Sequence, residues 1–386
     1  MAKRVPTVEN CTNLLRDMVQ INTCQPAGNE LDLVKYIEGV FAGKKVEMTR
    51  LDHGNNRCSL VVKLPGESDM GGLALLSHLD TVAYGDESKW TYPPLSATIA
   101  DGKLYGRGSA DMKSGAASMI EMALCLLDNE VPLKKPVFLC FTADEEVNGL
   151  GVVKVAESGL VNNVDAAIIA EPSNEDIGLS EKGALWFRLH AKGKLSHGSR
   201  PEIGINAVEK CMEFVARLRP LIDVTEVHPA LDTTTVSVTK LSGGIMTNVI
   251  PDDAVLEMDI RTLPSISHDK VIADAKDICA KMMEEKPGLV LELEIINNRP
   301  AVETAESDPF VEQLKAVHDK LGYKHTCKGL YFYTDASQLI PVIHKPFVIF
   351  GPADDKQAHQ TNEFAPLEAV RKLAEIYLTY VMDYLV

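Results

Sequence analysis

The sequence predicts an α/β fold in which a mostly parallel sheet, covered by helices on both faces, is interrupted by an inserted α+β domain. Short apolar segments, such as residues 73–77 and 137–142, alternate with amphipathic helical stretches, which is typical of buried parallel strands. Between residues 184 and 298 the predicted order changes to βαββαβ, the ferredoxin-like arrangement. A length of 386 residues also favours more than one domain.

The two outer segments, residues 1–183 and 299–386, are predicted to form one domain. Thr7 is a suitable N-cap for a first helix whose apolar positions include Leu14 and Met18. Further helices are expected near residues 29–43, 113–127, 309–321 and 367–385. Strands are expected at residues 59–64, 73–77, 137–142, 166–170 and 346–350.

The inserted segment, residues 184–298, is predicted to form the second domain. Its strands are expected at residues 184–191, 233–241, 254–263 and 289–296, and its helices at residues 205–218 and 269–285. Leu256, Met258 and Ile260 alternate with polar residues in the third strand. This alternation indicates a sheet with one face covered by helices and the other face open.

The composition excludes several classes of protein. A net charge of −16 makes binding to nucleic acid or to an anionic membrane unfavourable. No apolar run reaches the roughly 18 residues of a membrane-spanning helix, and no apolar stretch follows the basic pair Lys3-Arg4, so a secretory signal is not expected. The 8 cysteines form no Cys-x-x-Cys motif and are typical of reduced core residues. We therefore expect a cytoplasmic protein.

Residues that could carry chemistry follow several of the predicted strands. His78 comes directly after the strand at residues 73–77, and Asp80 could reach its ring and fix the tautomer. Asp111 lies in a glycine-rich loop that opens a helix, where it could be an N-cap or a metal ligand. The glycines of this loop do not follow a strand in the GxGxxG pattern, so a dinucleotide site is not expected.

Four more candidates stand at strand ends or in a loop of the same domain: Glu145, Glu146, Glu171 and His359. Taken singly, each has an ordinary explanation as a surface, turn or solvated loop residue. Together with His78 and Asp111, however, they are expected to meet along one edge of the sheet. Histidine and carboxylate ligands suit Zn²⁺ and related divalent ions. Two such ions would also compensate the negative charge that gathers there.

These residues lie in motifs that resemble the M20 family of metallopeptidases, in particular its acetylornithine deacetylase, succinyl-diaminopimelate desuccinylase and aminoacylase branch. The resemblance spans essentially the whole chain. Its motifs are SHLDT at 77–81, GRGSADMK at 106–113, DEE at 144–146, EP at 171–172, SHGSRP at 196–201, NVIP at 248–251 and AH at 358–359. Together these motifs are highly specific. Taken singly, only the motif at residues 106–113 approaches that specificity.

The resemblance implies a centre with two divalent metal ions, Zn²⁺ in the first place and Co²⁺ or Mn²⁺ as alternatives. Asp111 would bridge the two ions. His78 and Glu171 would complete the ligands of one ion, and Glu146 and His359 those of the other. The peptide bond that follows Asp111 would be cis.

The resemblance also implies the catalytic and substrate-binding residues. Glu145 would be the general base that moves a proton from water to the departing amine, and Asp80 would orient the neighbouring histidine ligand. His197 resembles a histidine of the family's lid domain that stabilises the tetrahedral intermediate. Asn248 and Arg261 resemble lid residues that hold the substrate carboxylate. As alternatives, His197 could be a simple turn residue and Arg261 could pair with acids on its own strand.

The implied function is metal-dependent hydrolysis of the amide bond of small N-acyl amino acids, of the N-acetylornithine or N-succinyl-diaminopimelate type. The implied assembly is a homodimer joined through the lid domain, residues 184–298. A metallo-aminopeptidase or dipeptidase acting on small peptides is the alternative, and a non-catalytic binding protein with the same fold is the third reading. Residues 331–337 stand where the family has a substrate-proximal loop, but they match no single member, so the acyl group stays open.

Overall fold

The computed structural model describes residues 3–386. Met1 and Ala2, the first two residues of the predicted first domain, lie outside the described residues. The chain divides into two compact units. The first contains residues up to 180 together with 303–328 and 334–386, and the second contains residues 181–302 and 329–333. The short segment 329–333 joins the second unit, where the Lys182 N–H donates a 3.0 Å hydrogen bond to the Leu330 carbonyl.

The first unit is built on a nine-stranded sheet. Its strand order is β1 (Glu47–Gly54), β2 (Arg57–Leu64), β6 (Val137–Thr142), β3 (Leu73–His78), β7 (Ala166–Ile169), β17 (Phe347–Ile349), β8 (Ile177–Glu181) and β15 (Val302–Glu303), with β16 (Cys327–Leu330) paired to β8. The central strands β6, β3, β7 and β17 are parallel. By contrast, β2 pairs antiparallel with β1 and β6, and β17 pairs antiparallel with β8.

The sheet is therefore mixed, and its parallel part is smaller than the sequence predicts. The hairpin of β1 and β2 explains one antiparallel edge, because Asn55 and Asn56 both adopt positive φ angles of 51° and 61°. Two consecutive residues in this conformation form the turn that closes a tight antiparallel hairpin. β1 was not predicted because most of its side chains are exposed, and it lacks the apolar run of a buried strand.

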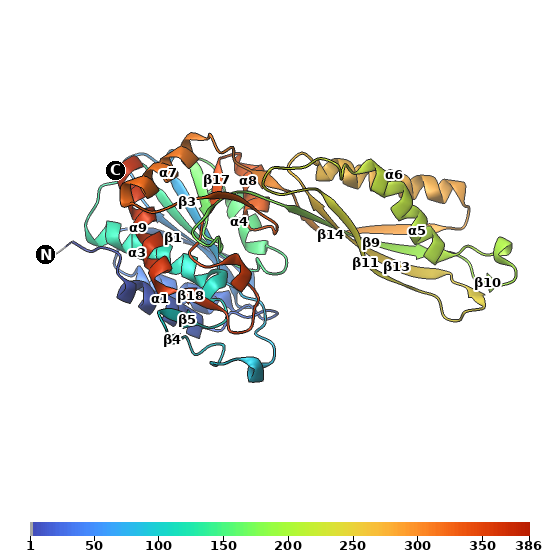
Figure 1. Ribbon diagram of the computed structural model, residues 1–386, viewed down its shortest axis with the longest axis horizontal. Helices are drawn as coiled ribbons and strands as arrows, with labels where there is room; N and C mark the ends of the chain where they lie inside the picture. Colours follow the sequence, from blue (N-terminus) through green and yellow to red (C-terminus); the bar gives the residue numbers. More distant parts are fainter. Residues whose placement is uncertain (1–2) are drawn as a thin grey trace. The chain divides into compact units, whose positions relative to one another are not determined.

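Helices cover both faces of this sheet (Figure 1). One face packs on α1 (Val8–Gln20), α2 (Glu30–Val40), α3 (Ser114–Asp128), α7 (Pro309–Leu321) and α9 (Leu367–Tyr384) through a common apolar core. The other face carries α4 (Leu150–Ser158) and α8 (Ala336–Ile343), which contact each other. A small sheet of β18 (Phe364–Pro366), β5 (Lys103–Tyr105) and β4 (Thr98–Ala100) completes the unit. The predicted α/β class with a covered sheet is thus confirmed.

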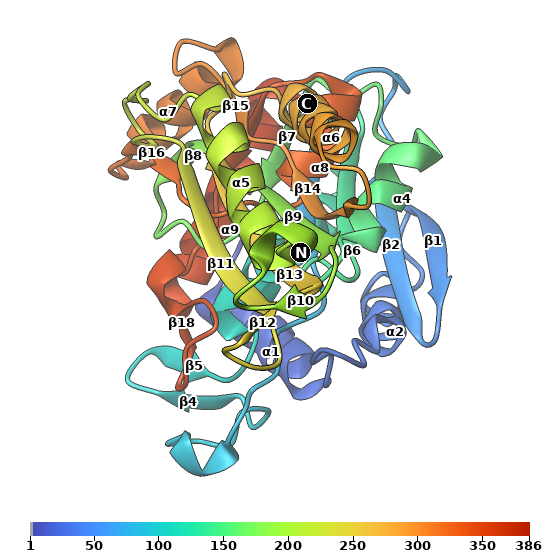
Figure 2. The ribbon, with the colours of Figure 1, turned by 90° about the vertical axis from the view of Figure 1, so that its right-hand side faces the viewer.

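The second unit has the predicted βαββαβ order. Its antiparallel sheet runs β11 (Thr235–Gly243), β13 (Asp253–Thr262), β9 (Gly183–Lys192) and β14 (Val290–Arg299). Two helices, α5 (Ala207–Leu218) and α6 (His268–Glu285), lie side by side on one face (Figures 1 and 2). Leu256, Met258 and Ile260 are buried beneath them, as their alternation predicts. A two-stranded ribbon pairs β10 (Ser196–His197) with β12 (Val249–Ile250).

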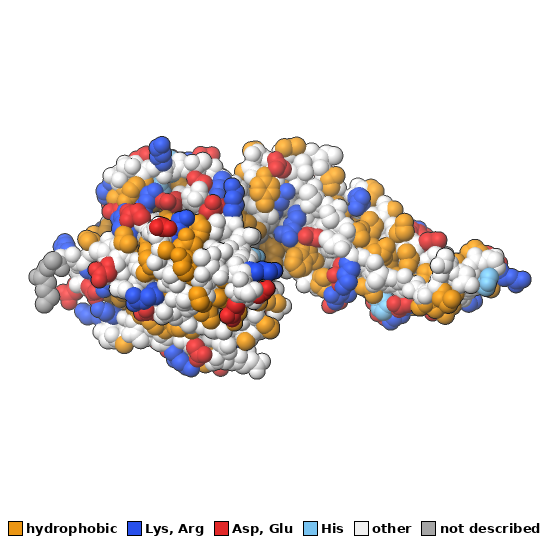
Figure 3. Space-filling view, turned by 60° about the horizontal axis from the view of Figure 1, so that its bottom comes forward, with side chains coloured by type: hydrophobic (Ala, Val, Ile, Leu, Met, Phe, Trp, Pro, Cys, Tyr) orange, Lys and Arg blue, Asp and Glu red, His pale blue; other side chains and the backbone are white. Residues whose placement is uncertain are grey.

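The surface bears charges of both signs. Figure 3 shows acidic and basic side chains interspersed over the visible face of each unit, without a continuous basic patch. None of the helices within residues 3–386 combines the length and the apolar character that crossing a membrane would need.

Candidate metal centre

The four parallel strands of the first unit each lead to predicted site residues. His78 is the last residue of β3, and Glu145 and Glu146 follow β6. Glu171 follows β7, and His359 lies in the loop after β17. Because carboxyl ends of parallel strands meet at the same edge of a sheet, the topology brings these residues together.

His78 is held in one tautomer. Its Nδ1 lies 2.9 Å from the backbone carbonyl oxygen of Asp80. A carbonyl can only accept, so Nδ1 carries the hydrogen of the neutral ring and Nε2 keeps its lone pair for a metal. The carboxylate of Asp80 lies farther from the ring, at 3.8 Å. The group that bonds the His78 ring is therefore the Asp80 main chain, and the predicted orienting role of the Asp80 side chain stays a prediction.

Asp111 lies between the two histidines. Its Oδ1 is 3.0 Å from His78 Nε2, and its Oδ2 is 3.4 Å from His359 Nε2. With φ −115° and ψ 96° it lies outside the helical region, and α3 begins only at Ser114, so Asp111 is not the N-cap of that helix. The Asp111–Met112 peptide bond is cis, as the resemblance implies. One carboxylate that faces two imidazoles through different oxygens has the geometry of a bridging ligand.

One further carboxylate accompanies each histidine. Glu171 Oε1 lies 3.5 Å from His78 Nε2, and Glu146 Oε2 lies 2.9 Å from His359 Nε2. Two ligands bound tetrahedrally at about 2.0–2.1 Å from Zn²⁺ are themselves about 3.3 Å apart. The observed separations therefore fit side chains that share an ion, and the nitrogen and oxygen donors fit the chemistry of Zn²⁺ and its neighbours.

The electrostatics of the cluster favour added positive charge. Hydrogen bonds to Asp111 and Glu146 raise the pKa of His359 to about 10. Burial disfavours the charged ring of His78, but Glu171 and Asp111 outweigh it and raise its pKa well above the ordinary value. Burial and the neighbouring acids raise the pKa of Glu171. The gathered carboxylates thus favour positive charge among them, and divalent ions would supply it.

Glu145 lies in the same group of donors. Its carboxylate falls within 4.8 Å of donor atoms of His78 and Glu171, and a second group of that kind joins His78, Asp111 and Glu146. Distance alone does not separate a ligand from a base here, so the role of Glu145 stays a prediction.

Asp80 anchors the backbone that carries Glu145 and Glu146. Its carboxylate accepts hydrogen bonds from the N–H groups of Glu145, at 3.0 Å, and Glu146, at 3.2 Å. It also accepts a 2.7 Å hydrogen bond from Gln25 Nε2. Asp80 is completely buried, so these charge-assisted bonds form in a region of low dielectric constant.

The sequence did not reveal Arg57. Its guanidinium pairs with Asp144, the first of the three adjacent acids, and also bonds the side chain of Gln25. Asp144 adopts a positive φ of 64°. The repulsion expected among the three acids is thus relieved by giving the first acid its own cation. No local pattern signals this pair, because Arg57 lies on β2, far from Asp144 in the sequence.

The remaining predicted residues lie in the second unit. His197 and Asn248 come close together, since the Gly198 N–H donates a 2.8 Å hydrogen bond to the Asn248 carbonyl. Arg261 forms a 3.0 Å ion pair with Asp259, and its guanidinium lies 5.9 Å from the ring centroid of Trp186. The alternative of a pair on its own strand is therefore realised for Arg261, and its substrate role stays a prediction.

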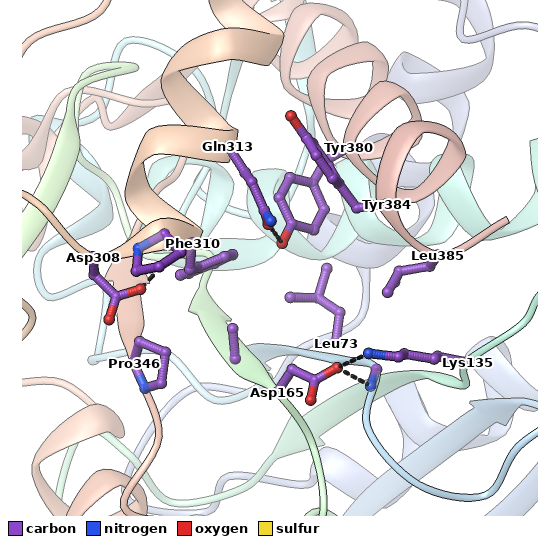
Figure 4. Close-up of a pocket in the computed structure, with 13 residues that line it drawn as sticks. Leu73, Lys135, Asp165, Asp308, Phe310, Gln313, Pro346, Tyr380, Tyr384 and Leu385 are labelled. Atoms are coloured by element: carbon purple, nitrogen blue, oxygen red, sulfur yellow. Dashed lines mark hydrogen bonds and ion pairs between the residues drawn. The ribbon is translucent and has the colours of Figure 1, made fainter.

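A pocket of about 370 Å³ lies elsewhere in the first unit. Figure 4 shows Leu73 and Pro346 among the residues that line it, and these stand at the beginnings of β3 and β17. The pocket is thus at the amino-terminal ends of the parallel strands, whereas His78 and His359 lie at or beyond their carboxyl-terminal ends. Lys135 pairs with Asp165 at 2.8 Å inside it. This pocket contains none of the candidate metal ligands.

The fold and the cluster together define a metal-dependent hydrolase. The sequence matches the peptidase family M20/M25/M40 over residues 74–383, which is well over half of its length. The chain belongs to this family.

Curated relatives align over nearly the whole chain. A probable succinyl-diaminopimelate desuccinylase of Staphylococcus aureus is 28% identical, covering 96% of this chain and 97% of that protein. An acetylornithine deacetylase of Shigella sonnei is 30% identical, covering 91% of this chain and 90% of that protein.

Solved structures share the fold at lower identity. Aminopeptidase PepT of Bacillus cereus has a TM-score of 0.77 at 22% identity, with coverage of 97% of this chain and 98% of that one. A dinuclear metal-binding peptidase of the M20 family from Bacillus subtilis has a TM-score of 0.71 at 19% identity, with coverage of 98% of both chains. These likenesses support the mixed α/β architecture.

Proposed function

We propose that this M20 hydrolase cleaves the amide bond of small N-acyl amino acids, using two divalent ions held by His78, Asp111, Glu146, Glu171 and His359. The observation that carries the proposal is the placing of Asp111 between two imidazoles, each of which has a carboxylate of its own beside it. We propose Zn²⁺ as the metal, because nitrogen and carboxylate donors at this spacing suit it.

The ions, when bound, supply Lewis-acid chemistry that makes water more acidic and polarises the substrate carbonyl. Glu145 takes the proton from the attacking water and delivers it to the amine nitrogen as the C–N bond breaks. A carboxylic acid and a free amine leave. Asp80 holds the Glu145 N–H at 3.0 Å, which keeps the base beside the ligands while the proton moves.

His197 is suited to donate a hydrogen bond to a developing oxyanion. The Ser199 N–H lies 3.2 Å from His197 Nδ1 and can only donate, so Nδ1 is the acceptor. The hydrogen of the neutral ring is then on Nε2. The His197 side chain is exposed, which leaves this N–H accessible to substrate. A donor of this kind is worth about 3–4 kcal/mol of transition-state stabilisation.

The second unit is proposed to be the lid and dimerisation domain. Strand β11 pairs with β13 on one side and forms an edge of its sheet. Most of its residues are exposed, among them the apolar Val238 and Leu241. Exposed edge strands are surfaces on which a second copy can add. Light scattering of the purified chain tests this, and a monomer at micromolar concentration would contradict it.

The acyl group is the part of the function that requires experiment. The curated relatives, which align along almost the whole chain, favour N-acyl amino acids. The metal-loaded protein should be assayed side by side on N-acetylornithine, N-succinyl-diaminopimelate and simple dipeptides. We expect the highest kcat/KM on an N-acyl amino acid. A higher value on dipeptides would favour a peptidase, and no hydrolysis of any compound would favour a binding protein.

A further inference from the structure

We propose that Glu363 is a positioning residue for two metal ligands: it holds the loop of Asp111 directly and His359 through Arg107. The inference rests on the proposed function, since it takes these two residues as ligands. Glu363 is completely buried and was not singled out by the sequence. It lies four residues after His359 and far in sequence from Asp111, yet its carboxylate contacts the backbone of the Asp111 loop.

The carboxylate of Glu363 is the hydrogen-bond acceptor for three backbone N–H groups of that loop. It accepts hydrogen bonds from Gly108, at 3.1 Å, from Ala110, at 2.8 Å, and from Asp111 itself, at 3.0 Å. Buried N–H groups need an acceptor, and a charged acceptor forms stronger bonds than a neutral one. The position of Asp111 is therefore set by a carboxylate that contacts neither histidine.

Arg107 extends this contact to the other ligand. Its Nη1 donates a 2.6 Å bond to Glu363, and its Nη2 lies 3.4 Å from the backbone carbonyl of His359. The guanidinium also packs 5.3 Å from the ring centroid of Trp90 and is almost completely buried. The Arg107–Glu363 pair thus connects the loop of Asp111 to the loop of His359.

The two metal positions depend unequally on this connection. The ion near Glu146 draws on both Asp111 and His359, whereas the ion near Glu171 shares only Asp111 with the connected loops. Groups that orient metal ligands typically contribute about 10–100-fold to metal affinity. We therefore expect loss of the Glu363 carboxylate to weaken one ion more than the other.

The experiment titrates metal-free protein with Co²⁺ and follows both heat and the visible absorption of the bound ion. Glu363→Gln keeps the shape of the side chain, but its amide nitrogen must face an N–H donor. The expected result is two sites in the unaltered protein, and in Glu363→Gln one site weakened about 10–100-fold with the other changed less. Excess Co²⁺ should restore most of the kcat.

Glu121→Gln is the matched control. Glu121 is also a completely buried carboxylate, and it accepts hydrogen bonds from Arg4, at 3.3 Å, and Asn10, at 2.9 Å. It lies on α3, and its hydrogen-bond partners Arg4, Asn10 and Cys125 are not candidate ligands. It should lower thermal stability without changing Co²⁺ affinity at either site.

Arg107→Lys is the second variant, in case Glu363→Gln does not fold. Lysine keeps the charge but cannot reach Glu363 and the His359 carbonyl together, so the same unequal weakening is expected. Two sites of unaltered affinity in either folded variant would overturn the inference, and so would equal weakening in Glu121→Gln. If the unaltered protein binds fewer than two ions, the proposed function itself fails, which is a different result.

Discussion

Replacing Gly115 by alanine is expected to disturb the metal centre from within the protein core. Gly115 lies in the first turn of α3, shortly after Asp111, and faces the end of β7 just before Glu171. A Cβ at this position would lie 2.2 Å from the carbonyl oxygen of Ala170 and 2.7 Å from its Cβ. Ordinary contacts of this kind are about 3.3–4.0 Å, so helix and strand must separate by about 1 Å.

The size of the effect follows from that separation. Overpacking of this kind costs about 1–3 kcal/mol, and the better helix propensity of alanine offsets up to about 1 kcal/mol. A net loss of about 1–2 kcal/mol corresponds to a fall in Tm of about 2–8 °C for a unit of this size. Because metal–ligand distances tolerate only about 0.2 Å, a shift between Asp111 and Glu171 should also reduce metal affinity.

The assay is thermal unfolding combined with measurement of bound metal. Gly39→Ala is the matched control, because Gly39 is an exposed helical glycine and nothing lies within 4 Å of its added Cβ. We expect this control to gain up to about 1 kcal/mol and to keep its metal. If Gly115→Ala unfolds at the same temperature as the control and binds metal equally well, the reasoning about close packing behind the site is wrong.

Three other outcomes are expected. Glu145→Ala should retain both metals while kcat falls about 10²–10⁴-fold, and metal loss measured by atomic absorption would make Glu145 a ligand instead. Arg57→Met leaves Asp144 buried without its cation, so chemical denaturation should show that the free energy of unfolding falls by about 3–5 kcal/mol. Arg57→Lys should recover part of this loss. An unchanged denaturation midpoint in Arg57→Met would contradict the pairing. Burial lowers the pKa of His318 below its ordinary 6.5, so the folded state binds fewer protons than the unfolded state in mild acid. The free energy of unfolding present near pH 7.5 should therefore fall as the pH drops through 6.5, and this group should contribute at most about 1.4 kcal/mol per pH unit to the fall. Between pH 7.5 and pH 5.5, the Tm of His318→Gln should fall less than the Tm of the unaltered protein.

The sequence predicts the buried parts of this fold well. Apolar runs without polar alternation occur in β3 and β6, whose side chains are all buried, and these strands are found where expected. Strands such as β1 are determined by their partner and by a turn, so their side chains carry little information about burial. The parallel core was therefore predictable, while its antiparallel edges were not.

The candidate site divides in a similar way. Histidines and acids at strand ends can be predicted, because the chemistry needs those side chains and the topology of an α/β sheet brings strand ends together. The residues that hold the site are harder to find. Glu363 acts on backbone N–H groups, and Arg57 pairs with Asp144 from a distant strand, and neither contact requires a recognisable spacing.

The four central strands have a consequence for the lifetime of the protein. Under the proposed assignment, the donors for one pair of ions come from residues as far apart as His78 and His359, so no fragment of the first unit can offer the complete set. Ions that bind only the finished fold stabilise it by about 2.7 kcal/mol when present at a hundred times their dissociation constant. Metal supply in the cell would then govern how long each molecule escapes proteolysis, in addition to whether it can turn over substrate.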